Sequence, residues 1–183
     1  MNFAKTLIAT GAIIMLTSCD SKPASTSNPA TAQPPPSTVP SAPTAAEQAQ
    51  RDALAAYLGM WDAFVAAAAT SDGQSSKLSQ YATGFALSTL SQGLKADRDN
   101  GFVSKGSPNH NAQVSSVEPL ANPVKVTIGD CSDSTNALKY RVDNGEPADD
   151  GAGGRRFIKA TVEKQADGSW KVTSFGVQGV GTC

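Results

Sequence analysis

The chain has 183 residues, with 15 Lys and Arg against 16 Asp and Glu, one histidine and a formal net charge of −1. The first eighteen residues contain one charged side chain, Lys5. Without them the chain has 14 basic and 16 acidic side chains, and the net charge becomes −2. A nucleic-acid-binding protein usually carries a basic patch or a high pI, and attraction to anionic lipid needs a cluster of Lys and Arg. The composition therefore argues against both kinds of partner.

The first element along the chain is an uncharged, mostly apolar run over residues 6–16. It is shorter than the ~20 residues that a membrane-spanning helix needs and has the length of the apolar region of a signal peptide. The run ends in Leu16-Thr17-Ser18-Cys19, which resembles a bacterial lipobox. An ordinary signal peptide that happens to contain a cysteine, or a buried N-terminal strand, remains the alternative.

The lipobox resemblance implies a signal peptide over residues 1–18 and a diacylglyceryl group on Cys19. Two acyl chains hold a protein firmly on a membrane, whereas one gives only marginal binding. The expected location is therefore extracytoplasmic, with the domain anchored to the outer face of the cell membrane. Whether the molecule is later released from its anchor is left open.

A segment rich in Ser, Thr, Pro and Ala follows, over residues 19–45, and it contains no aromatic residue. Such a composition cannot bury enough apolar surface to offset the entropy lost on ordering, and proline favours extended backbone. The sequence predicts a disordered tether there and one folded domain over residues 46–183. The hydroxyl side chains of the tether are possible attachment points for sugars.

The cysteines in the predicted domain are Cys131 and Cys183. Two cysteines in an exported domain favour a disulfide, which would close a loop of about 52 residues. Two free thiols or a metal pair are the alternatives. The metal pair is disfavoured because the chain has a single histidine and no CxxC motif. We expect no metal and no cofactor.

The first segment of the predicted domain has the apolar periodicity of a helix. Apolar residues three and four apart predict a long amphipathic helix over residues 46–70, with Thr44 and Glu47 placed as a capping box. The apolar stripe consists of Leu54, Tyr57, Leu58, Trp61, Phe64, Val65 and Ala68. A short helical piece is expected over 75–82 and a third helix over 84–99.

The period then changes from about 3.6 to two, which is typical of strands. The predicted strands are residues 113–118, 124–129, 138–142, 156–164 and 170–175. Asp167-Gly168, between the last two, is a strong hairpin signal. Helices followed by an antiparallel sheet predict the α+β class. A long N-terminal helix and two shorter helices packed on a curved sheet of four to five strands form an NTF2-like cone.

Three segments extend this resemblance beyond the fold: "YLGMWDAFVAAAATSD" from Tyr57, "LKYRVDNGEP" from Leu138 and "DGSWKVTSFGVQGVGTC" from Asp167. They resemble a family of secreted actinobacterial proteins and lipoproteins that has no assigned activity. The resemblance covers most of the domain and implies an NTF2-like fold and a location in the cell envelope. It implies no catalytic residues.

NTF2-like cones often enclose a pocket between the long helix and the sheet. A carboxyl group buried in such a pocket has a raised pKa and can transfer protons near neutral pH. Asp62, beside the apolar stripe, is a weak candidate for this role, and an acid at the helix boundary paired with a base is the alternative. Tyr57, Trp61, Tyr140 and Trp170 are candidates for lining an apolar pocket, or are core residues.

The remaining polar residues suggest no catalytic motif. His110, in "SPNHNAQ", has no cysteine or acidic neighbour at ligand spacing and is predicted to be a solvated loop residue. Asp130, Asp133 and Asn136 do not fit the spacing of an EF-hand and are predicted to form turns around the disulfide.

A run of acidic residues, glycines and basic residues extends from Asp149 to Arg156. It is not a phosphate-binding loop because no Gly-Lys-Ser/Thr follows. A flexible hairpin loop of mixed charge is expected. A partner-binding loop with Asp149, Asp150, Arg155 and Arg156 is the functional alternative.

These observations give one leading hypothesis and two others. The leading hypothesis is a non-catalytic binding module at the bacterial cell envelope, with a protein partner or a small apolar ligand. The second is an isomerase-like or hydrolase-like enzyme that acts on a small apolar molecule with Asp62 as acid or base. The third is a homodimerising accessory piece of an envelope complex.

Overall fold

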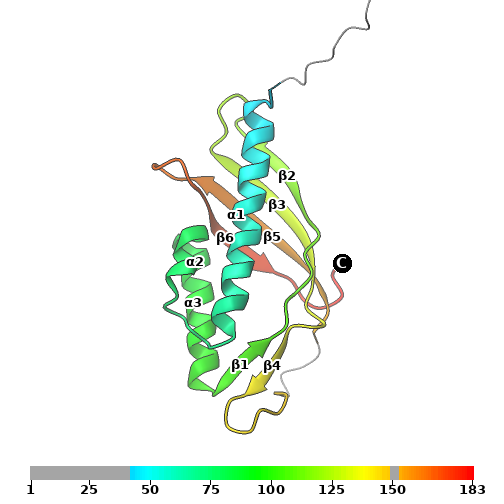
Figure 1. The fold of residues 1–183 in the computed structure, drawn as a ribbon. Coiled ribbons are helices and arrows are strands. Elements are labelled where there is room, and N and C mark those ends of the chain that lie inside the picture. The colour runs from blue at the N-terminus through cyan, green and yellow to red at the C-terminus, as the bar shows by residue number, and fades with distance from the viewer. Residues whose placement is uncertain (1–41, 149–152) are drawn as a thin grey trace, which may run out of the picture. The chain divides into compact units, whose positions relative to one another are not determined.

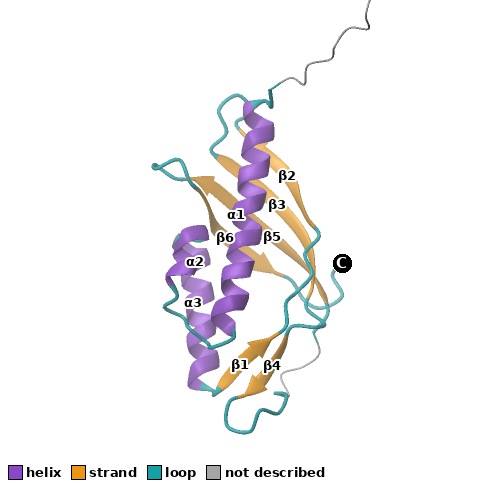
Figure 2. Ribbon diagram, in the orientation of Figure 1, coloured by secondary structure: helices purple, strands orange, loops and turns teal. Residues whose placement is uncertain are grey.

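The computed structural model describes residues 42–148 and 153–183. In this part of the chain, helices come first and antiparallel strands follow, which confirms the α+β prediction (Figure 1, Figure 2). The helices are α1 (Ala45–Ala68), α2 (Ser76–Tyr81) and α3 (Gly84–Asp99). The strands are β1 (Phe102–Lys105), β2 (Ala112–Glu118), β3 (Lys125–Asp133), β4 (Leu138–Arg141), β5 (Arg155–Lys164) and β6 (Trp170–Val177).

The long helix α1 begins where its sequence predicts. The Thr44 side chain accepts a hydrogen bond from the Glu47 backbone N–H, at 3.2 Å, and the Glu47 carboxylate accepts one from the Thr44 N–H, at 2.7 Å. This capping box satisfies N–H groups that the first turn of a helix leaves without partners. The helix then crosses the concave face of the main sheet (Figure 1). Its buried face is mainly alanine, with Tyr57, Met60 and Trp61 as the large side chains.

The main sheet has the strand order β2-β3-β5-β6, and all its pairs are antiparallel. Along β3 every second residue is buried, starting at Val126 and Ile128, as expected for a strand that covers a core on one face. The prediction ended this strand at residue 129, and that boundary is wrong. Strand β3 continues to Asp133, where it pairs with Arg155 of β5.

Strands β1 and β4 form a second, two-stranded sheet, with Phe102 opposite Arg141 and Lys105 opposite Leu138. The segment over β4 was predicted as a strand, but its partner β1 was not. Strand β1 is only four residues long and follows directly on the turn at Gly101, whose φ of 69° ends α3. The main sheet therefore has four strands, and the small sheet lies beside the C-terminal ends of α1 and α3 (Figure 1).

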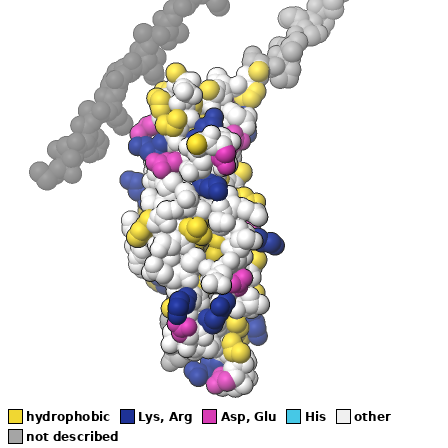
Figure 3. All heavy atoms as spheres, turned by 90° about the vertical axis from the view of Figure 1, so that its left-hand side faces the viewer, with side chains coloured by type: hydrophobic (Ala, Val, Ile, Leu, Met, Phe, Trp, Pro, Cys, Tyr) yellow, Lys and Arg dark blue, Asp and Glu magenta, His cyan; other side chains and the backbone are white. Residues whose placement is uncertain are grey.

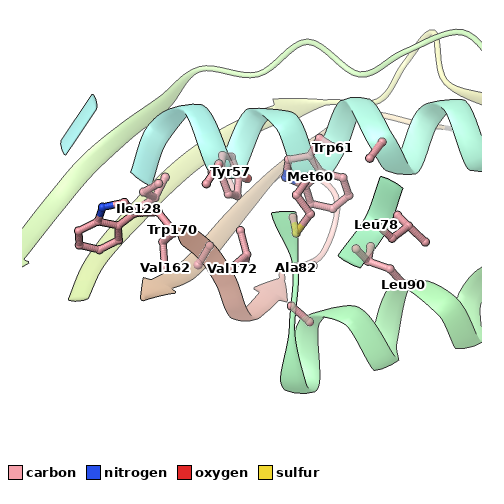
Figure 4. Close-up of a cluster of buried hydrophobic side chains, with 14 of the residues drawn as sticks. Tyr57, Met60, Trp61, Leu78, Ala82, Leu90, Ile128, Val162, Trp170 and Val172 are labelled. Carbon is pink, nitrogen blue, oxygen red and sulfur yellow. The ribbon is translucent and has the colours of Figure 1, made fainter. Parts of the chain in front are cut away.

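The hydrophobic core lies between the helices and the main sheet (Figure 4). Tyr57, Met60 and Trp61 project from α1 toward the sheet, and Leu90 comes from α3. The buried apolar residues of the described chain run from Ala49 to Val172. Because the segment 42–183 contains this core and the disulfide described next, it has what an independently folding domain requires.

Cys131 and Cys183 form the predicted disulfide, with their Cα atoms 5.8 Å apart. The bridge fixes a C-terminal tail that runs along β5. In this tail the Gln178 N–H donates to the Phe157 carbonyl, at 2.9 Å, and the Gly181 N–H donates to the Arg155 carbonyl, at 2.8 Å. The tail therefore continues the pairing of β5 beyond the end of β6.

The surface seen in Figure 3 carries both signs of charge, with basic and acidic side chains interspersed over that face. This agrees with the nearly balanced composition. Among the helices that the structure describes, none combines the length and apolar character needed to cross a bilayer. The predicted signal peptide, the predicted lipidation site Cys19 and the predicted tether up to residue 41 lie outside the described residues.

Candidate functional site

The most unusual side chain in the core is Asp130. It occupies the third inward-facing position of β3, after Val126 and Ile128, and it is completely buried. A carboxylate is costly to bury unless charge or hydrogen bonds replace the water that it loses. Its neighbours therefore decide whether the fold tolerates it.

Three donors, one from α1 and two from the segment between β1 and β2, meet the Asp130 carboxylate. The Tyr57 hydroxyl of α1 donates to Oδ2 at 2.8 Å, and the backbone N–H of Asn111 donates to Oδ1 at 2.8 Å. His110 Nδ1, in the segment between β1 and β2, lies 2.6 Å from Oδ2. Because an ionised carboxylate only accepts hydrogen bonds, this contact assigns the proton to Nδ1. The cluster Tyr57–His110–Asn111–Asp130 is hereafter the polar cluster.

The hydrogen bonds set the charge states within the polar cluster. Burial raises the pKa of Asp130, but hydrogen bonds from His110 and Tyr57 outweigh it, so the pKa lies below the usual value. Burial, and next the negative charge of Asp130, raise the pKa of Tyr57 well above its usual range. At neutral pH the aspartate is therefore ionised and the tyrosine is protonated.

Trp61 connects the polar cluster to a cavity. Its indole stacks on the His110 ring, with centroids 5.5 Å apart and planes 25° apart, and it meets the rings of Phe64 and Phe175 at steeper angles. The Nε2 atom of His110 is buried and has no partner among the described residues. Trp61 lines the cavity and His110 does not. The imidazole therefore affects the cavity only indirectly, by fixing the position of the indole that stacks on it.

The cavity has a volume of about 540 Å³ and lies at the end of the core nearest the small sheet. Its apolar side chains come mainly from α1 and from the ends of β5 and β6. Its polar side chains come from α3, β1, β3, β4 and β5. The lining residues are Trp61, Phe64, Val65, Ala68, Gly93, Ala96, Asp97, Ser104, Gly106, Pro108, Ser132, Ser134, Ala137, Lys139, Arg156, Ile158 and Val177.

Three charged side chains line this cavity. Lys139 of β4 forms an ion pair with Asp97 of α3, with Nζ 2.7 Å from Oδ1. Arg156 of β5 is half-buried and pairs in register with Ser132 of β3, on the face that carries Ile158. Arg156 makes no hydrogen bond or ion pair with any residue that the structure describes. The cavity thus combines an apolar wall on α1 with the guanidinium of Arg156 on β5.

The aromatic residues predicted to line a pocket are distributed over different environments. Trp61 lines the cavity, and Tyr57 belongs to the polar cluster behind it. Trp170 lies in the core at the end of α1 away from Trp61 (Figure 4). Tyr140 is on the small sheet, where the Lys105 ammonium lies 4.2 Å from its ring centroid.

Three sequence predictions about polar residues are wrong. Asp62 is exposed on α1 and lines no described cavity, because the helical twist turns it away from the buried face that Trp61 occupies. His110 is not solvated, since its side chain is 12% exposed and bonded to Asp130. Asp130 is not a turn residue, because β3 extends through it. Asp133 does form a turn, accepting from the Thr135 N–H at 2.9 Å.

The charged loop between β4 and β5 is described only in part, because Asp149 and Asp150 lie outside the described residues. Arg155 is exposed and places a guanidinium nitrogen 3.3 Å from Cys131 Sγ. Arg156 lines the cavity instead of the outer surface. Within residues 42–148 and 153–183, no group of three His, Cys, Asp or Glu side chains could hold a metal ion.

Comparison with known proteins supports the fold. A scan against family models and a search of curated proteins find no match. Similar solved structures include the intermembrane-space region of the chloroplast protein ARC6, with a TM-score of 0.52, 16% identity, and coverage of 70% of this chain and 95% of that one. At such identity the likeness shows the fold alone.

Two further structures resemble the chain more loosely. A ketosteroid isomerase-like protein from Erwinia carotovora atroseptica has a TM-score of 0.44 and 11% identity, and covers 69% of this chain and 92% of its own. A cystatin-like protein of unknown function from Nostoc punctiforme has a TM-score of 0.39 and 17% identity, and covers 73% and 91%. The order of the helices and strands and the antiparallel main sheet give the chain the predicted NTF2-like fold.

Proposed function

We propose that this NTF2-like domain binds a small molecule with an apolar body in the cavity lined by Trp61 and Phe64. The proposal rests on the size and lining of this cavity. Its volume of about 540 Å³ lies within the ~300–1,000 Å³ range of small-molecule sites, which combine apolar walls with a few placed polar groups. Trp61 is held by stacking on His110, so one wall is organised before any ligand arrives.

Binding is favoured over catalysis by the state of the polar cluster. An acid or base must reach a reacting atom at hydrogen-bond distance. Asp130 is completely buried, and the Nε2 atom of His110 is also buried, away from the residues that line the cavity. The cluster therefore serves to position Trp61, and neither the Asp130 carboxylate nor the His110 imidazole is presented to a substrate.

The cellular setting that we propose is the outer face of a bacterial cell membrane, with a diacylglyceryl group on Cys19 as the anchor. Supporting this are the lipobox-like sequence and the Cys131–Cys183 disulfide, since disulfides persist in oxidising compartments outside the cytoplasm. Growth of producing cells with an alkyne-tagged fatty acid should label the wild-type protein and leave a Cys19→Ala variant unlabelled. Equal labelling of both would exclude this anchor.

Filling the cavity should abolish ligand binding without harming the fold. Gly93 of α3 lines the cavity, and a Cβ atom added there meets nothing within 4 Å. Gly93→Leu should weaken binding of the neutral dye N-phenyl-1-naphthylamine at least tenfold, measured by fluorescence titration of the 42–183 domain. Its melting temperature should not fall, because glycine inside a helix is less favourable than most residues by up to ~1 kcal/mol.

Gly93→Ala is the matched control, because it changes the helix propensity in the same direction and leaves most of the cavity empty. It should bind the dye as the wild type does. Unchanged binding in Gly93→Leu, or no saturable binding in the wild type, would rule out this cavity as the ligand site.

A further inference from the structure

The cavity offers its ligand an unmatched positive charge. Among the charged side chains that line it, Asp97 and Lys139 pair with each other, whereas Arg156 meets no carboxylate in the described residues. An arginine side chain stays protonated at any physiological pH, and its guanidinium suits the planar geometry of a carboxylate. The lining thus carries one more positive than negative charge.

A second polar group stands directly beside this arginine. Ser132 is opposite Arg156 in the β3–β5 register, and residues in such pairs have Cβ atoms ~4.5–5.5 Å apart. Ser132 is buried, lines the cavity, and its hydroxyl forms no hydrogen bond with a described residue. Ser134, nearby, differs because its hydroxyl exchanges hydrogen bonds with Gly154, at 3.1 and 3.2 Å. The donor groups of Arg156 and Ser132 therefore have no acceptor among the described residues.

The apolar wall faces a different part of the ligand. Trp61, Phe64, Val65 and Ala68 follow one another along α1 at helical spacing and offer no charge. A molecule that satisfies both walls needs an acidic group at one end and a hydrocarbon body at the other. A fully apolar ligand would leave the guanidinium without a partner. A small free anion would leave the aromatic side chains of the cavity in contact with water.

We infer that the ligand is an anionic amphiphile, with a carboxylate held by Arg156 and Ser132 and an apolar body packed against Trp61 and Phe64. This inference rests on the proposed function of the cavity and adds the chemical class of its ligand. Hydrogen bonds to charged groups are worth about twice as much as neutral ones. The acidic group should therefore contribute a clear preference over an uncharged analogue of the same chain length.

The test compares decanoate with decan-1-ol as competitors of the neutral dye on the 42–183 domain at pH 7.5, where the carboxylic acid is ionised. Wild-type protein should prefer decanoate at least about tenfold. Arg156→Gln should abolish this preference, leave the decanol affinity unchanged and keep the wild-type circular dichroism spectrum. Arg156→Lys should retain part of the preference, and Ser132→Ala should reduce it by less than Arg156→Gln does.

Lys159→Gln is the matched control because it removes the same charge from the same strand on the exposed, opposite face. It should keep the full preference. Equal binding of decanoate and decanol by the wild type, or a preference that survives Arg156→Gln, would overturn the assigned ligand class while leaving the cavity as a binding site. If the dye binds but neither competitor displaces it, the inference also fails. If no dye binds at all, the proposed function itself fails.

Discussion

Replacing Asp130 with alanine should lower the free energy of unfolding by about 3–5 kcal/mol, because a buried donor that loses its acceptor costs ~1–3 kcal/mol and three donors share this one. The substitution leaves the Tyr57 hydroxyl, the Asn111 N–H and His110 Nδ1 without their shared acceptor. Single domains are typically stable by only ~5–15 kcal/mol, so this is a large fraction of the total. Urea unfolding of the oxidised protein, read by far-UV circular dichroism, measures the loss.

Tyr57→Phe removes one donor and should cost about 1–3 kcal/mol. Asp133→Ala is the matched control on the same strand, because the Asp133 side chain accepts hydrogen bonds only from Thr135 and lies outside the core. Its cost should stay below about 1 kcal/mol. A loss in Asp130→Ala no greater than in Asp133→Ala would mean that the polar cluster does not stabilise the fold.

The difference in unfolding free energy between the wild type and Asp130→Ala should also depend on pH, which gives an independent check. The pKa of Asp130 in the folded protein is lowered, so the unfolded chain binds the proton more readily. The stabilisation is therefore complete above the unfolded-state pKa of ~3.9 and decreases as pH falls through the lower folded-state value. The difference in stability between wild type and Asp130→Ala should shrink below about pH 4.

Opening the disulfide should have an effect of similar size. The bridge joins residues separated by 52 positions, and the chain-entropy model then gives roughly 4 kcal/mol. We expect a Cys131→Ser, Cys183→Ser double variant to lose about this much stability in urea unfolding. We also expect faster amide exchange at Gln178 and Gly181, because their hydrogen bonds to β5 would lose the covalent closure of the tail.

Either single cysteine variant, with its remaining thiol blocked, should reproduce the loss in the double variant, because both open the same loop. Lys164, whose N–H donates to the Val124 carbonyl at the end of β5 away from the tail, serves as the internal reference for exchange. A stability change below about 1 kcal/mol, with unchanged exchange at Gly181, would show that the tail is held by its hydrogen bonds alone.

The sequence predicted most of the fold because its signals are local. The capping box at Thr44 and the Asp167-Gly168 turn each specify a few neighbouring residues, and both features are present. The predicted stripe of α1 is confirmed in part, because Tyr57 and Trp61 are buried but Leu58 is exposed. Strand β1 escaped prediction because four residues show too little alternation to indicate a strand. As a result, β4 was predicted without its partner strand in the small sheet, which is β1.

The site was harder to predict because its parts are far apart in the chain. Tyr57 lies 73 residues from Asp130, and His110 lies 20 residues from it. One signal was available, since Asp130 continues the two-residue alternation of Val126 and Ile128 and so must face inward if the strand continues. The donors that make this acceptable are brought together only by the packing of α1 on the sheet.

The buried carboxylate on β3 also has a consequence for strand register. A shift of β3 by one residue would turn its whole buried row outward, which the core forbids. A shift by two would keep the apolar face inward, so Val126 and Ile128 alone discriminate weakly against it. With Asp130 in that row, the same shift would separate the carboxylate from Tyr57 and His110. The polar cluster thus selects one alignment of the central strands from those that hydrophobic packing would accept.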